Sequence, residues 1–155
     1  MKPILTLLCA LLMTVATAFA DDNALFKELA SHNDIQYTYF SPAMLQAFGD
    51  RQIRTKNFSI SASDLTSVET VKTMGDGKAN KAVMNQVKKI IKNEKLEVLA
   101  TKTSQLGSYY TILGRPQKKG RQLSQLLCID FSAAEFLTVT YLRGNITLDD
   151  ARLPF

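Results

Sequence analysis

The sequence predicts an α+β fold in which an antiparallel sheet carries helices packed on one face. Helical patterns occur in the first part of the chain, up to about residue 93. From residue 96 the pattern changes to four strands joined by short turns, which is typical of an antiparallel meander. One or two further strands precede the meander. Helices early and hairpins late favour a layered α+β architecture.

Residues 1–20 have the pattern of a cleavable secretory signal. Lys2 supplies a positive charge, residues 4–20 are uncharged and mostly apolar, and Ala18-Phe19-Ala20 places small residues where a signal peptidase cuts. An uncleaved membrane anchor is the weaker alternative, because the apolar run ends in a cleavage motif. A lipoprotein signal is rejected, since Leu8 precedes Cys9 where a small residue is needed. We therefore expect residues 21–155 to form a single exported α+β domain, in the periplasm or outside the cell.

Cleavage after Ala20 leaves 135 of the 155 residues, and the loss of Lys2 lowers the net charge from +5 to +4. This mild charge does not indicate nucleic-acid binding. Cys128 is then the one remaining cysteine, so no internal disulfide is possible and burial of apolar side chains must hold the domain together. No second apolar run is long enough to span a membrane, so we expect a soluble product.

The first half of the chain contains two helices and a strand. Asp22-Asn23 can cap a first helix with an apolar face. Residues 35–40 alternate as a short strand, and Ser41-Pro42 begins a second helix that Gly49 ends. Residues 50–64 show no clear pattern. The apolar face of the first helix comprises Ala24, Leu25, Phe26, Leu29 and Ala30.

The clearest helix spans residues 78–93 and follows a β-branched strand at 65–73 and a turn at Gly75-Asp76-Gly77. Apolar residues fall on one side of this helix and lysines largely on the other. The apolar side has Val83, Met84, Val87, Ile90 and Ile91, and the basic side has Lys81, Lys88, Lys89 and Lys92.

The four strands of the meander are predicted at 96–103, 109–113, 123–131 and 136–143. Turns at Gly107-Ser108, 114–121 and 132–135 join them. Gly144-Asn145 then leads into residues 146–153, where we expect a last strand residue or two and a final helical turn.

Three segments resemble a known family. They are the segment Tyr39 to Leu45 behind a signal and an apolar helix, the strand at 65–73 with its long helix, and the run from Phe136 to Asp150. Together they are similar to the small exported bacterial proteins grouped as domain of unknown function 4252. The resemblance implies export and an α+β fold, and it implies no established activity, ligand or functional residue.

No convincing catalytic or metal-binding set is present, so we name no catalytic, cofactor-binding or metal residue and expect no cofactor. His32 is the single histidine and lies in a polar turn. Cys128 lies between apolar neighbours in a strand and is expected to be a core residue. Gly75 to Lys78 is too short for a phosphate-binding loop. The pair Asp149-Asp150 is better explained as helix capping than as two catalytic carboxylates.

The strongest polar feature is a basic loop with Arg115, Lys118, Lys119 and Arg121. The loop is a candidate contact for an anionic partner, such as a lipid headgroup, an acidic glycan or an acidic protein surface. A solvated loop tip that discourages edge pairing of strands is the favoured interpretation. A group of tyrosines is a weaker candidate for a ligand pocket: Tyr37, Tyr39, Tyr109 and Tyr110.

The leading hypothesis is a non-enzymatic binding or envelope-associated module. The first alternative is a secreted hydrolase whose site is assembled only in the fold. It would show a concave pocket with several titratable groups of perturbed pKa, whereas a binding module would show a broad surface patch. The second alternative is an envelope-stress or regulatory protein that acts through a protein partner.

Overall fold

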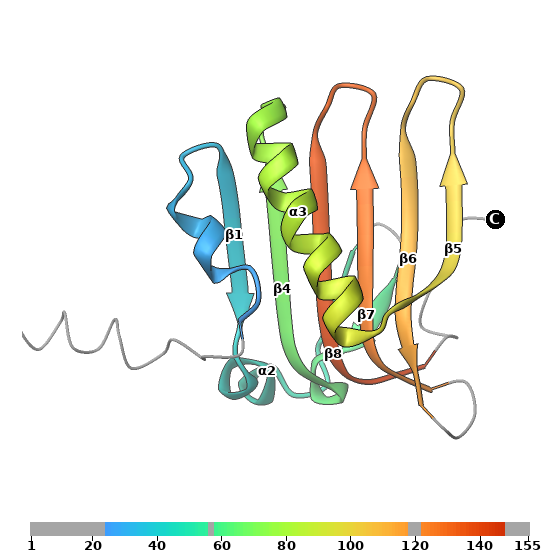
Figure 1. Ribbon diagram of the computed structural model, residues 1–155. Helices are drawn as coiled ribbons and strands as arrows, with labels where there is room; N and C mark the ends of the chain where they lie inside the picture. The colour runs from blue at the N-terminus through green and yellow to red at the C-terminus, as the bar shows by residue number, and fades with distance from the viewer. Residues whose placement is uncertain (1–23, 56–57, 118–121, 148–155) are drawn as a thin grey trace, which may run out of the picture.

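A six-stranded antiparallel sheet forms the centre of the computed structural model, which describes residues 24–55, 58–117 and 122–147 (Figure 1). The strand order is β1-β4-β8-β7-β6-β5. The last four strands form the meander, and β8 closes it against β4. The predicted α+β class and C-terminal meander are confirmed. The strands are β1 (Ile35–Phe40), β4 (Leu65–Thr73), β5 (Glu97–Thr103), β6 (Tyr109–Pro116), β7 (Gln122–Phe131) and β8 (Leu137–Thr147).

Helix α3 (Gly77–Glu94) connects β4 to β5 and lies across one face of the sheet (Figure 1). The Asp76 carboxylate caps it by accepting a hydrogen bond from the amide of Lys78 at 3.0 Å. Val83, Val87 and Ile90 of α3 are buried against the sheet. The predicted amphipathic helix is therefore present, one residue longer at each end.

The short 3₁₀ helix η1 (Lys27–Ser31) packs beside β1 on the same side as α3. The sequence predicted a helix that includes Ala24 and Leu25, but the amides of Leu25 and Phe26 donate to the Glu69 carboxylate of β4. Helical hydrogen bonding begins at Phe26, whose carbonyl accepts from the amide of Leu29 at 3.0 Å, which explains the shorter helix.

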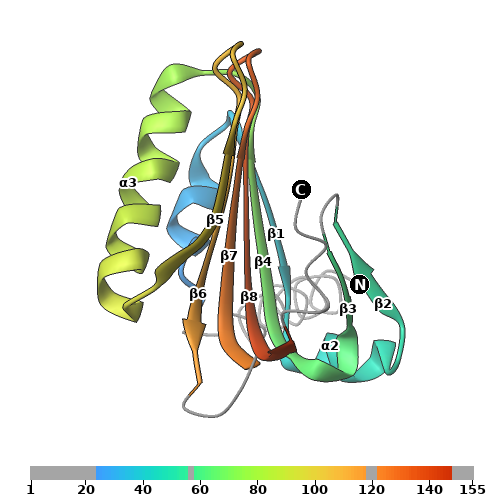
Figure 2. The same ribbon diagram turned by 90° about the vertical axis from the view of Figure 1, so that its right-hand side faces the viewer.

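The opposite face of the sheet is covered in part by α2 (Pro42–Phe48), the hairpin β2 (Gln52–Arg54) and β3 (Ser59–Ser61), and the 3₁₀ turn η2 (Ala62–Asp64) (Figure 2). The Ser41 hydroxyl caps α2 by accepting from the amide of Met44 at 3.3 Å, as its position before Pro42 predicted. Leu45, Phe58 and Ile60 pack on the sheet and form a second core. Strands of three residues are too short to show the alternation that identifies a strand in a sequence.

Two strands run further than the sequence predicted. β6 includes Gly114 and Arg115, which were expected in a loop, and β8 continues through Gly144 to Thr147. Gly144 adopts φ +150°, and a Cβ at this position would overlap the carbonyl oxygen of Asp64. The glycine is thus required by a close backbone approach inside the sheet and does not end the strand. Residues 148–153, where a helical turn was predicted, lie outside the described residues.

Glu69 of β4 is a fully buried carboxylate, with 0% of its surface exposed. It accepts hydrogen bonds from the amides of Leu25 at 3.0 Å and Phe26 at 2.9 Å and from the Tyr37 hydroxyl at 3.2 Å. Gln86 of α3 donates to the Leu25 carbonyl at 2.6 Å. A carboxylate is tolerated in a core when such donors replace water. Glu69 therefore fastens the N-terminal segment to β1, β4 and α3.

Replacing Glu69 by Gln should lower the free energy of unfolding by about 3 kcal/mol, because one acceptor is lost and the side-chain amide NH₂ group then faces the buried N–H donors. Urea denaturation followed by circular dichroism measures the change. Glu97→Gln on the exposed edge strand β5 is the matched control and should leave stability nearly unchanged. Equal midpoints for the two variants would contradict the assigned role of Glu69.

Gly144→Ala should destabilise the protein by about 3 kcal/mol, since the added methyl meets backbone that cannot move aside. Gly77→Ala, at the start of α3, meets nothing within 4 Å and should be neutral or slightly stabilising. Thermal unfolding of the pair checks the contrast. A Gly144→Ala protein as stable as Gly77→Ala would show that β8 does not approach Asp64 so closely.

Candidate functional site

The face of the sheet opposite α3 carries three rows of side chains that become more polar with distance from α2. The row nearest α2 is apolar and includes Phe40, Val68, Leu142 and Leu126. The middle row, from β1 to β5, is Thr38, Thr70, Thr140, Cys128, Ile112 and Ala100. The outer row is Gln36, Lys72, Thr138, Asp130, Tyr110 and Lys102.

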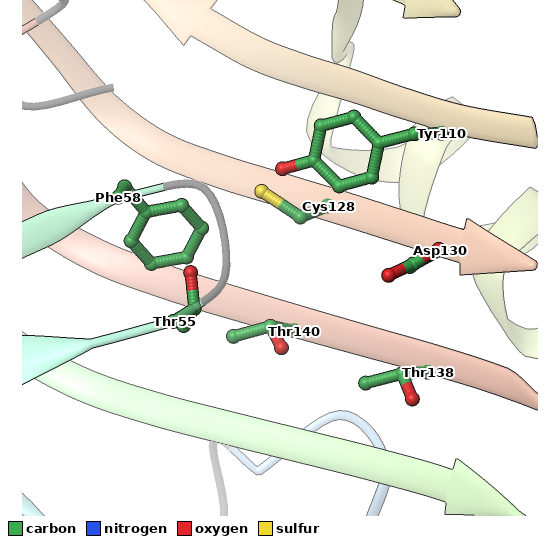
Figure 3. A pocket seen from close by; sticks show the side chains of 7 residues that line it. All are labelled: Thr55, Phe58, Tyr110, Cys128, Asp130, Thr138 and Thr140. Atoms are coloured by element: carbon green, nitrogen blue, oxygen red, sulfur yellow. The ribbon is translucent and has the colours of Figure 1, made fainter. Parts of the chain in front are cut away.

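A cavity of about 70 Å³ lies where the end of the β2–β3 hairpin meets the middle and outer rows (Figure 3). The hairpin contributes Thr55 and Phe58, and a hydrogen bond of 2.8 Å from the Thr55 amide to the Phe58 carbonyl holds its turn. The sheet contributes Tyr110, Cys128, Asp130, Thr138 and Thr140.

The sheet register places the polar side chains of this cavity next to one another. Asp130 pairs across strands with Thr138 and Tyr110, and Cys128 pairs with Thr140. Directly opposed residues in an antiparallel pair have Cβ atoms about 5 Å apart, close enough for their side chains to bind one small group together. Alternation within β7 and β8 turns Cys128 and Asp130, and Thr138 and Thr140, to the same face.

The Cys128 thiol is buried, as the sequence predicted, and it also lines the cavity. Burial raises the pKa of Cys128 from 9.0 to about 12, and a hydrogen bond with Tyr110 opposes this only in part. The thiol is therefore protonated at neutral pH. A protonated thiol is a weak hydrogen-bond donor and a poor nucleophile.

Asp130 is the charged residue of the cavity, and the remaining polar lining consists of hydroxyl groups and the thiol. Hydroxyls of Thr and Tyr both donate and accept hydrogen bonds, whereas an ionised Asp only accepts. Within the described ranges, no three His, Cys, Asp or Glu side chains come together as metal ligands. The hydroxyl groups and the Asp130 carboxylate can therefore form hydrogen bonds to one polar group from several directions. Asp130 is the one carboxylate among the described residues that line the cavity.

The other residues singled out in the sequence do not join this cavity. His32 is exposed at the end of η1, where its amide donates to the Leu29 carbonyl at 3.1 Å. Gly75 to Lys78 form the turn and cap of α3, as predicted. Asp149 and Asp150 lie outside the described residues, as do residues 1–20.

Of the four basic candidates, the structure places Arg115 alone. Arg115 lies in β6, half exposed, with a guanidinium nitrogen 3.9 Å from a carboxylate oxygen of Glu94. Glu94 also accepts a hydrogen bond from Gln125 at 2.8 Å. Lys118, Lys119 and Arg121 lie outside the described residues, so their proposed contact with an anionic partner stays a prediction.

The four tyrosines considered as a pocket do not converge. Tyr37 and Tyr39 belong to β1, and Tyr109 and Tyr110 to β6, with three strands between them. The Tyr37 hydroxyl donates to Glu69, and the Tyr109 ring stacks on Phe131 with centroids 5.2 Å apart. Tyr110 alone reaches the cavity.

The chain belongs to the family Domain of unknown function (DUF4252), which matches residues 26–152. This confirms the resemblance seen in the sequence, and the match includes every residue of the cavity. No curated protein and no solved structure matches the chain. In the described part of the chain, no helix has both the length and the apolarity needed to cross a membrane.

Cys128 should resist a thiol reagent such as Ellman's reagent at pH 8 in the native protein and react promptly in denaturant, because its thiol is buried and protonated. A Cys128→Ala variant corrects for any other thiol. Rapid native reaction at this position would contradict the described burial.

The same burial predicts a loss of stability in alkali. Because the native pKa of Cys128 is raised from 9.0 to about 12, the stabilisation from the neutral thiol is fully present below pH 9 and is lost as pH rises toward 12. Burial also raises the pKa of Tyr109 and of Tyr141. Denaturation at rising pH should therefore show a steeper decline for the native sequence than for Cys128→Ala, and parallel declines would oppose the assignment.

Proposed function

We propose that the protein is exported through its N-terminal signal and acts outside the cytoplasm as a non-enzymatic binding module. Its binding site is the cavity between the β2–β3 hairpin and the sheet, and its ligand presents an uncharged, hydroxyl-rich group such as part of a saccharide. The observation that carries this proposal is the lining, in which four hydroxyls and one carboxylate surround a space of about 70 Å³ beside two aromatic rings.

The chemistry of the lining favours a hydroxylated ligand. Sugar hydroxyls donate to Asp130 and exchange hydrogen bonds with Thr55, Thr138 and Thr140 in either direction. The C–H edges of a sugar can pack on the Phe58 ring. A phosphate or carboxylate would instead meet the negative charge of Asp130 with no cation in the lining.

The cavity size and its surroundings suggest how such a ligand lies. A space of about 70 Å³ is roughly half of the engineered 150 Å³ cavity that admits benzene, so it takes one end group and not a whole ligand. The middle row continues from Thr140 to Thr70 and Thr38 across β8, β4 and β1. A longer ligand could therefore extend along this row of threonines.

The same residues support binding in preference to hydrolysis. Glycoside hydrolysis uses two carboxyl groups on either side of the scissile bond, and the lining contains Asp130 without a second one. A thiol whose pKa is about 12 is not poised to attack a carbonyl group.

A glycan array probed with the purified protein should identify saccharides that bind. Thr138→Val in the cavity and Asp130→Asn should each weaken binding about tenfold, through the loss of one buried hydrogen bond. Thr101→Val, exposed on β5, is the control and should bind normally. Equal binding by all variants would place the site elsewhere, and retention of amines in place of saccharides would reassign the ligand.

Export is tested separately by the intact mass of the protein purified from its native cells. The expected species begins at Asp21. Recovery from the cytosol with Met1 still attached would contradict export.

A further inference from the structure

The outer side of α3 is entirely free of acidic residues. The residues of this helix and its C-cap that face solvent are glycine, asparagine or lysine, and lysine predominates. They are Gly77, Lys78, Lys81, Asn85, Lys88, Lys89, Lys92, Asn93 and Lys95. We call the six lysines in this set the lysine face.

The lysine face is narrow and continuous. At about 100° per residue, its five members within the helix fall in an arc of about 100°, opposite the buried Val83, Val87 and Ile90. The helix is about 27 Å long for its 18 residues. Figure 2 shows α3 as the outermost layer on its side of the sheet, so the lysines form an exposed basic ridge.

The charge of this ridge is not neutralised within the described part of the protein. Glu94 is the acidic residue of α3, and its carboxylate is engaged with Gln125 and Arg115. No acidic side chain among the described residues forms an ion pair with the lysine face. Lys88 and Lys92 are spaced i,i+4, a separation at which like charges destabilise a helix. An opposite charge from outside the molecule would relieve this repulsion.

We propose that the lysine face docks the protein on an anionic lipid bilayer surface. Lysine acts as a point charge that suits a diffuse layer of headgroups, whereas recognition of individual phosphates favours the fork of arginine, which α3 lacks. The large exposed apolar residues of the described chain are Met44, Met74, Val98, Leu106 and Phe136, none of them on α3. Docking is therefore electrostatic adsorption without insertion.

This inference is independent of the ligand proposed for the cavity, and it concerns the opposite face of the sheet. Because α3 and the β2–β3 hairpin lie on opposite sides, a protein adsorbed through α3 keeps its cavity open to solvent (Figure 2). The lysine face is also distinct from the basic set singled out in the sequence, whose described member Arg115 belongs to β6.

Sedimentation with phosphatidylcholine vesicles, with and without phosphatidylglycerol, tests the proposal. The protein should bind only the anionic vesicles and should dissociate when salt rises from about 50 mM to about 500 mM. Each lysine near such a surface contributes about a fivefold gain in partitioning, so K81E/K88E/K92E should reduce binding by at least about a hundredfold.

The matched control is R54E/K72E/K102E, which changes the net charge by the same amount on the side of the sheet away from α3. This variant should retain most of the binding, and circular dichroism confirms that both variants fold. Equal losses in the two variants would show that net charge alone is responsible and would overturn the proposal. Unchanged vesicle binding by K81E/K88E/K92E would also overturn the proposal. The same holds if binding is lost only in a variant with reversed charges at Lys118, Lys119 and Arg121, or if the protein binds an acidic glycan but not the vesicles.

Discussion

The buried carboxylate of Glu69 is the interaction on which the arrangement of one whole layer depends. It binds two consecutive backbone amides from the start of the described chain and one hydroxyl from the edge strand β1. A charge in this position is costly unless every donor is in place. The requirement fixes where the N-terminal segment enters the fold, how η1 begins, and, through Gln86, how α3 lies against that segment. The apolar core around Phe26 and Val83 packs between the elements that these hydrogen bonds hold together.

The two faces of the sheet differ in how completely other elements cover them. The face under α3 is covered by an apolar core that also encloses three polar residues of β4, Ser67, Glu69 and Thr73. On the other face, the hairpin packs on the apolar row and reaches part of the middle row, and residues such as Thr38, Lys72 and Lys102 stay exposed. Antiparallel sheets tolerate such a half-covered face because alternate residues can be polar without disturbing the core. The cavity exists because the hairpin ends at the boundary between these two regions.

Much of the fold could be predicted from the sequence, because long elements repeat their pattern many times. The alternation in Leu65–Thr73 and the apolar stripe of α3 each span enough residues to be unambiguous. The cavity could not be predicted, since its lining comes from three strands and from the connection between β2 and β3, and no single segment of the sequence reveals the register between them. Thr55 and Phe58 were hidden in a stretch whose strands are three residues long. Glu69 looked like one polar residue in a strand, and no local signal marks a carboxylate whose donors lie more than 40 residues away.

The position of β8 constrains when the fold can form. This strand, the last one in the described part of the chain, lies in the middle of the sheet, between β4 and β7. Until residues 137–147 are available, the pair β1–β4 and the hairpins of β5 to β7 have no common sheet, and each presents an unsatisfied strand edge. The native topology is thus completed by contacts far apart in sequence, which form slowly. A polypeptide that emerges from its N-terminus onward therefore cannot complete this sheet before residues 137–147 have emerged.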